Sequence, residues 1–187
     1  MGKLTLKDLK RLAKQPAASS PVVRVALIGD TATQFLATAL RGLGVAKGYN
    51  IDLFEAEYNQ VYQQFMDPDS ELYKHDAEFI VLFQSTHKLC EKHSMLSPQE
   101  QVSLASERLQ FVESVAETPA LGGMKIICLN YPEIEDTVFG SYANKVVSSF
   151  TYQVRKLNFG LMELAQKHPN LFVCDIVGLQ NKLGRDF

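Results

Sequence analysis

Five short apolar segments, each followed by a segment with a helical pattern, constrain the fold of this 187-residue chain more than any other feature. The apolar segments are 22–28, 51–56, 77–83, 124–130 and 171–176. Strands that are apolar on both faces and alternate with helices are typical of a parallel sheet covered on both sides. With right-handed crossovers, the pattern predicts a three-layer α/β/α sandwich. Its sheet is doubly wound and five-stranded, in the flavodoxin-like order 2-1-3-4-5.

The segments between the strands predict the helices. Leucines spaced through residues 4–14 indicate a short amphipathic helix, and QPAASSP at 15–21 a linker. Helices are expected from about 30 to 47, from Ser97-Pro98 onward, from about 141 to 167, and in a short last segment ending at Leu183. Residues 84–96, with His87 and His93, are expected to form a loop. We therefore divide the chain into residues 1–20, a helix and linker, and residues 21–187, one α/β domain.

Charge and hydropathy exclude several classes of function. Nineteen basic residues against 21 acidic ones give a net charge of −2, so no nucleic-acid or anionic-membrane partner is expected. No apolar run approaches the ~20 residues that a membrane helix needs. The N-terminus has no apolar core of signal-peptide length, which predicts a cytoplasmic protein. Of the three cysteines, Cys128 and Cys174 lie in apolar runs and are expected to be reduced core residues.

Ligands of open parallel sheets bind at the carboxyl ends of the strands, which selects the candidate site residues. Gly29, Asp30 and Thr31 follow the first strand, where a glycine turn and a small hydroxyl suit an oxyanion site or a nucleophile. Alternatively, Asp30 or Thr31 only caps the next helix. Other polar residues at strand ends are Glu55, Glu57, Gln84, Ser85 and Asn130. Asn130 either orients a substrate carbonyl or simply ends its strand.

The histidines do not predict a metal site. His87, Cys90 and His93 would need one turn to supply all three ligands, so we expect exposed loop histidines there. His168 precedes Pro169 and is expected to end a helix. No metal ion or cofactor is therefore assigned to this chain. The phosphate-loop patterns of nucleotide binders are also absent where they would follow a strand, which disfavours a flavodoxin-like nucleotide-binding function.

Two motifs carry a resemblance to a known family. Residues 55–60 read E-A-E-Y-N-Q, and residues 67–73 read D-P-D-S-E-L-Y. Together with a first strand that ends in glycine and a small polar residue, they resemble the N-terminal domain of FkbH-like proteins. In that family an SGNH-hydrolase-like α/β domain precedes a phosphatase domain of the haloacid-dehalogenase type, subfamily IIIC.

Compared with active SGNH hydrolases, this sequence differs in the blocks that carry the catalytic residues. Active SGNH hydrolases have G-D-S in the first block, where this chain has Gly29-Asp30-Thr31. Residues 83–86 supply neither the glycine nor the asparagine expected after the third strand, and no histidine follows Asp175 up to Phe187. We therefore expect an accessory, catalytically degenerate domain. The alternative is an active esterase or acetyl-hydrolase that uses Thr31 as its nucleophile, with a histidine from the His87 segment or from outside this chain.

The resemblance further implies the partners. They would be a downstream phosphatase-like domain that uses Mg²⁺, and a carrier protein or a small acyl or sugar ligand. Related proteins transfer a glyceryl unit from a phosphorylated three-carbon donor to a carrier-protein thiol.

Overall fold

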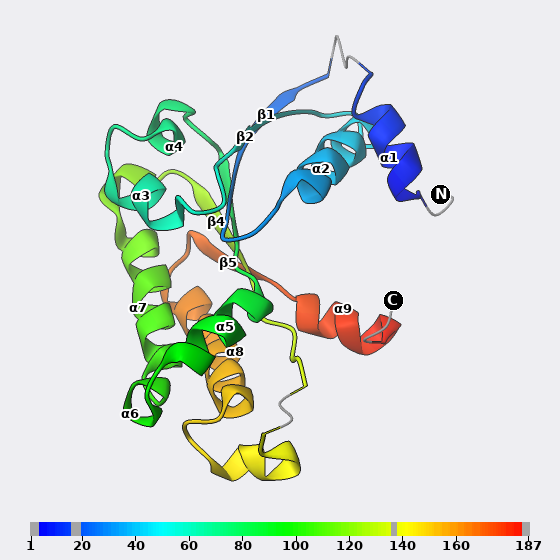
Figure 1. The fold of residues 1–187 in the computed structure, drawn as a ribbon. Helices are drawn as coiled ribbons and strands as arrows, with labels where there is room; N and C mark the ends of the chain where they lie inside the picture. The colour runs from blue at the N-terminus through cyan, green and yellow to red at the C-terminus, as the bar shows by residue number, and fades with distance from the viewer. Residues whose placement is uncertain (1–3, 16–19, 136–137, 185–187) are drawn as a thin grey trace. The chain divides into compact units, whose positions relative to one another are not determined.

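A computed structural model describes residues 4–15, 20–135 and 138–184 of the chain (Figure 1). Five strands form one parallel sheet in the order β2-β1-β3-β4-β5, surrounded by helices, which confirms both the predicted fold class and the predicted strand order. The chain divides into two compact units, Met1–Leu82 and Phe83–Phe187, which are described in turn.

The first unit contains three strands and the helices between them. Its elements are α1 (Leu6–Leu12), β1 (Val22–Gly29), α2 (Gln34–Ala46), β2 (Asn50–Glu55), α3 (Val61–Met66), α4 (Glu71–Lys74) and all but the last residue of β3 (Phe79–Phe83). β1 and β2 pair in parallel, with Val25 opposite Leu53. Ala26, Leu27 and Ile28 are fully buried, as a strand covered on both faces requires.

Helix α1 packs closely on α2. Thr5 and Asp8 form a capping box at the start of α1, and a Cβ atom placed on Gly42 of α2 would overlap the backbone of Leu9. The ammonium of Lys10 also lies 4.8 Å from the centre of the Phe35 ring. The predicted N-terminal helix is therefore confirmed. Of the predicted linker 15–21, residues 16–19 lie outside the described residues.

The second unit contains the last two strands. Its elements are α5 (Thr86–Met95), α6 (Pro98–Gln101), α7 (Leu104–Glu117), η1 (Pro119–Leu121), β4 (Lys125–Leu129), η2 (Gly140–Lys145), α8 (Phe150–Lys167), β5 (Leu171–Cys174) and α9 (Ile176–Leu183). β4 and β5 are parallel, with Cys128 opposite Val173. Among the described residues, no helix combines the length and the apolar character that crossing a bilayer demands.

The loop predicted around His87 and His93 is wrong, because this segment forms helix α5. The apolar pattern of this segment is too weak to predict a helix, but two tertiary contacts hold the helix in place. Leu89 is buried in the unit, and a ring nitrogen of His93 lies 2.7 Å from the Ser148 carbonyl oxygen. His87 itself is exposed on this helix.

Two predicted long helices differ from the structure: one is divided into two helices, and the other begins later than expected. The start at Ser97 is confirmed by a capping box with Glu100, but α6 ends at Gln101 and a separate helix begins at Leu104. The helix predicted from about residue 141 begins only at Phe150, where the Ser149 hydroxyl accepts a hydrogen bond from the Tyr152 N–H. The buried side chain of Gln153 hydrogen-bonds to the backbone at both places.

The cysteines differ in environment. All three are free thiols. Cys128 is buried, and this burial raises the pKa of its thiol to about 12. The prediction of a second core cysteine is wrong, because Cys174 is exposed at the end of β5, at the edge of the sheet.

Candidate functional site

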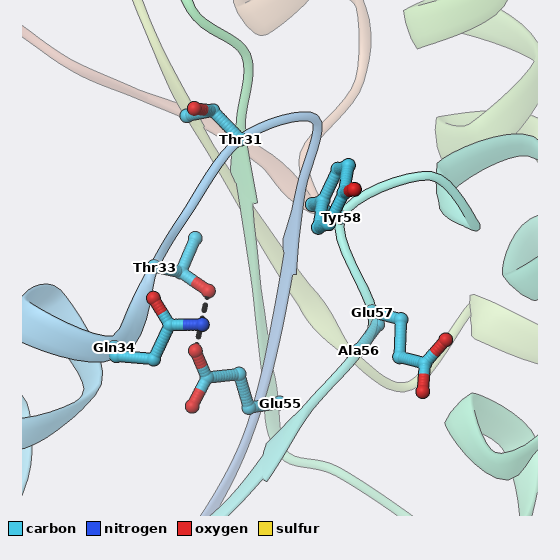
Figure 2. Close-up of a pocket in the computed structure, with 7 residues that line it drawn as sticks. All are labelled: Thr31, Thr33, Gln34, Glu55, Ala56, Glu57 and Tyr58. Atoms are coloured by element: carbon cyan, nitrogen blue, oxygen red, sulfur yellow. Dashed lines mark hydrogen bonds between the residues drawn. The ribbon is translucent and has the colours of Figure 1, made fainter.

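A cavity of about 450 Å³ lies within the first unit, where β1 and β2 end (Figure 2). Its walls come from the turn after β1, the first residue of α2, and the end of β2 with the loop that follows. The lining residues are Thr31, Thr33, Gln34, Glu55, Ala56, Glu57 and Tyr58. The cavity therefore lies at the carboxyl ends of parallel strands, where α/β proteins bind their ligands.

One short hydrogen bond joins the two sides of this cavity. The Thr33 hydroxyl, on a residue that is only 3% exposed, donates to the carboxylate of Glu55 at 2.6 Å (Figure 2). The bond connects the β1–α2 turn to the end of β2. Because the acceptor is a carboxylate, this bond belongs to the stronger class of hydrogen bonds.

The interpretation that Asp30 or Thr31 caps α2 is wrong. The helix begins at Gln34, its N-cap residue is Thr33, and the Thr33 side chain makes no capping hydrogen bond. The Thr33 hydroxyl donates to Glu55 across the cavity instead. Thr31, the predicted nucleophile, lies in the preceding turn and lines the cavity.

The charge of the lining is negative. Glu55 and Glu57 both contribute carboxylates, which point in different directions in Figure 2, and none of the lining residues is a lysine, arginine or histidine. This field opposes an anionic ligand and accepts a neutral or cationic one. Hydroxyl and amide groups from Thr31, Gln34 and Tyr58 offer hydrogen bonds to such a ligand.

The candidate residues Gln84, Ser85 and Asn130 lie in the second unit. Gln84 is buried, and its Oε1 accepts a 2.8 Å hydrogen bond from the Tyr131 hydroxyl. Ser85 occupies the N-cap position of α5. That these residues line a ligand site stays a prediction.

Asn130 connects the end of β4 to the start of α9. Its Nδ2 donates to Asp175 at 2.8 Å, and its Oδ1 accepts from the backbone N–H groups of Ile176 and Val177 at 2.8 and 3.1 Å. Asp175 in turn accepts from the Gly178 N–H and caps α9. These bonds hold the end of one strand against the beginning of a helix.

Sequence reasoning did not single out Gln34 and Tyr58 as residues of this cavity. Both carried a positional signal, since one opens α2 and the other comes three residues after the end of β2. Neither residue type is specific to a binding site, so only their shared place on the cavity wall identifies them.

The family model described as the FkbH N-terminal domain matches residues 24–187. The chain belongs to the FkbH N-terminal domain family. This confirms the resemblance that residues 55–60 and 67–73 carry. No curated protein matches the sequence significantly.

Solved structures extend the comparison. The N-terminal part of the protein BF1531 from Bacteroides fragilis, which contains a phosphatase domain complexed with Mg, is 52% identical with a TM-score of 0.94. That match covers 99% of this chain and 48% of the other, so this FkbH N-terminal domain spans about half of it. The acetyl xylan esterase AlAXEase is 15% identical with a TM-score of 0.53, covering 86% of this chain and 83% of that one, and shows a shared fold.

Proposed function

We propose that this FkbH N-terminal domain is an accessory, non-hydrolytic SGNH-hydrolase-like domain that binds a small sugar-like ligand beside Thr31. The observation that carries the proposal is the lining of the cavity. Hydroxyls, one amide and two carboxylates surround it, without a cationic side chain. Polyhydroxylated ligands bind to such groups through hydrogen bonds, whereas a carboxylate or phosphate ligand would be repelled by Glu55 and Glu57. An acyl chain would find only Ala56 and the Tyr58 ring as apolar contacts.

The lining also argues against ester hydrolysis. A hydroxyl nucleophile requires a base within hydrogen-bond reach, and no lining residue is a histidine. Glu55 accepts from Thr33 rather than Thr31. Losing members of a hydrolase triad typically costs about 10³–10⁶ in rate. We therefore infer that this SGNH-hydrolase-like domain binds its ligand without hydrolysing it.

The parent protein, on this proposal, resembles the Bacteroides fragilis protein in carrying a phosphatase-type domain, here of the haloacid-dehalogenase class. Any Mg²⁺ would be bound by that domain. We further propose that the parent is cytoplasmic and acts as a phosphatase-type hydrolase or an acyl or glyceryl transferase. This domain would then hold the substrate or position a carrier protein.

A nuclear magnetic resonance titration tests the ligand class. We expect D-xylose and D-glucose at millimolar concentrations to shift the backbone amide signals of Thr31, Thr33 and Tyr58 in the ¹⁵N-labelled chain. Gln34→Ala should weaken the response, because it removes an amide from the cavity wall. Gln63→Ala, an exposed glutamine on α3, is the matched control and should respond like wild type. Shifts confined to Leu6–Leu12, or none with either sugar, would contradict this ligand assignment.

An ester assay tests the accessory role separately. We expect wild type and Thr31→Ala to hydrolyse p-nitrophenyl acetate at the same rate, indistinguishable from buffer with an unrelated protein. Circular dichroism of both proteins controls for folding. Measurable turnover by wild type that disappears in Thr31→Ala would establish the active-esterase alternative.

A further inference from the structure

Two carboxylates and one imidazole converge at the end of helices α7 and α8 in the second unit. Glu113 and Glu117 lie one turn apart on α7, and His168 directly follows the last residue of α8. One ligand atom from each residue lies within 4.8 Å of the others. The two helices pack against each other and bring together residues more than 50 positions apart (Figure 1).

The imidazole of His168 is the unusual member of this cluster. The residue is only 9% exposed, and its Nε2 has no solvent contact and no hydrogen-bond partner. That nitrogen faces the two carboxylates, at 3.7 Å from Glu113 and 4.0 Å from Glu117. Both distances exceed a hydrogen bond. This buried ring nitrogen is therefore aimed into an acidic cluster without a hydrogen bond of its own.

We propose that Glu113, Glu117 and His168 form a binding site for a divalent transition-metal ion of the zinc type. Imidazole and carboxylate are ligands that zinc accepts, whereas Mg²⁺ and Ca²⁺ prefer oxygen ligands only. With bonds of about 2.0–2.2 Å, two ligands of one tetrahedral ion lie roughly 3.4 Å apart. The observed 3.7 and 4.0 Å come near this value. Three protein ligands leave the fourth position open for water.

The backbone around His168 holds the imidazole in place. The His168 N–H donates to the Leu164 carbonyl at 2.9 Å, and its own carbonyl accepts from the Leu171 N–H at 3.0 Å. The neighbouring Asn170 side chain donates to the carbonyl of Ala116 on α7 at 3.0 Å. The backbone of His168 is therefore held by hydrogen bonds, and its buried ring faces the two carboxylates before an ion binds.

Lys167 competes with the ion for the carboxylates. Its ammonium hydrogen-bonds to Glu113 and lies 3.7 Å from Glu117. The Lys167 side chain is 58% exposed and can turn into solvent when an ion binds. The two carboxylates therefore pair with the Lys167 ammonium when the site is empty, and with the metal ion when one binds.

Calorimetric titration of the metal-free, tag-free chain with ZnCl₂ tests the site. We expect one saturable zinc ion per chain. His168→Ala and Glu117→Gln should each weaken binding about 10–100-fold or more, since both remove a direct ligand. Lys167→Met should tighten binding about tenfold or more by removing a competing charge. The matched control, His87→Ala, removes an exposed histidine from α5 and should bind zinc like wild type.

Two further measurements keep the test decisive. If His168→Ala does not fold, Glu117→Gln still tests the site, because the Glu117 side chain is 56% exposed. In addition, the nuclear magnetic resonance signals of the His168 imidazole in wild type should shift on zinc addition. Co²⁺ should give the visible absorption of a tetrahedral site. Binding that is not saturable, or that is unchanged in both Glu117→Gln and Lys167→Met, would overturn the proposal. So would loss of binding in His87→Ala.

Discussion

The side-chain Oε1 of Gln153 accepts a 2.9 Å hydrogen bond from the backbone N–H of Ala105, 48 residues earlier in the chain. The Nε2 of the same side chain donates to the carbonyls of Val102 and Val147, at 3.3 and 2.7 Å. Gln153 is only 1% exposed. One buried amide thus binds the backbone at the α6–α7 break and again just before α8.

Replacing Gln153 by leucine should lower the free energy of unfolding by about 2–4 kcal/mol. The change leaves one N–H and two carbonyls without their partner in a buried place, and each such loss costs about 1–3 kcal/mol, partly relieved by relaxation. Urea denaturation followed by circular dichroism measures the difference. Gln110→Leu, on the exposed face of α7, is the control and should change stability by less than about 0.5 kcal/mol. Equal stability of Gln153→Leu and wild type would show that water replaces the amide.

Thr33→Val should destabilise the chain by about 1.5–3 kcal/mol. It retains the shape of a buried side chain but removes the donor to Glu55, and a hydrogen bond to a charged acceptor contributes about this much. Thr31→Val, in the same turn, serves as the comparison and should have a smaller effect. Chemical denaturation of the three proteins provides the test. If both variants lose the same amount, the effect belongs to the turn and not to the Thr33–Glu55 bond.

Gly42→Ala should separate α1 from α2. A methyl group on Gly42 would overlap the backbone of Leu9, which cannot yield without moving the helix. Overpacking of this kind costs about 1–3 kcal/mol. We expect faster tryptic cleavage at Lys7, Lys10 and Arg11, as seen by mass spectrometry. Gly123→Ala meets no atom within 4 Å and should be cleaved like wild type; unchanged cleavage of Gly42→Ala would contradict the observed packing.

Asp175 should contribute stability that depends on pH. The N–H of Gly178, followed by the amide of Asn130, holds the pKa of this carboxyl below its ordinary value. A carboxyl with a lower pKa in the folded state stabilises the fold above its unfolded pKa of about 3.9, and this contribution is lost as the pH falls through the folded pKa.

Asp175→Asn isolates that charge, because asparagine is an equally good N-cap residue. The difference in unfolding free energy between wild type and Asp175→Asn should be larger at pH 6 than at pH 3. Denaturation at both pH values measures it. A difference that does not change with pH would mean that the charge of Asp175 adds nothing to its capping role.

The strands were predictable because their signal is local. Runs such as 22–28 are short and almost wholly apolar, which favours a strand covered on both sides. Their alternation with helices, together with right-handed crossovers, predicted the doubly wound parallel sheet. The helix start at Ser97-Pro98 was equally readable, since the Ser97 and Glu100 of its capping box are three positions apart. Thr31 was correctly placed at the end of the first strand, although its role stays a prediction.

The tertiary structure decided what depends on residues that are distant in sequence. The helix breaks before Leu104 and Phe150 exist because Gln153 supplies hydrogen bonds that a continuous helix would have made for itself. Thr33 occupies the N-cap position of α2, but its hydroxyl donates to Glu55, which is 22 positions away. His168 meets Glu113 only because α7 and α8 pack together. Local propensity describes each segment by itself, whereas these contacts arise when folding brings separate segments within hydrogen-bond distance.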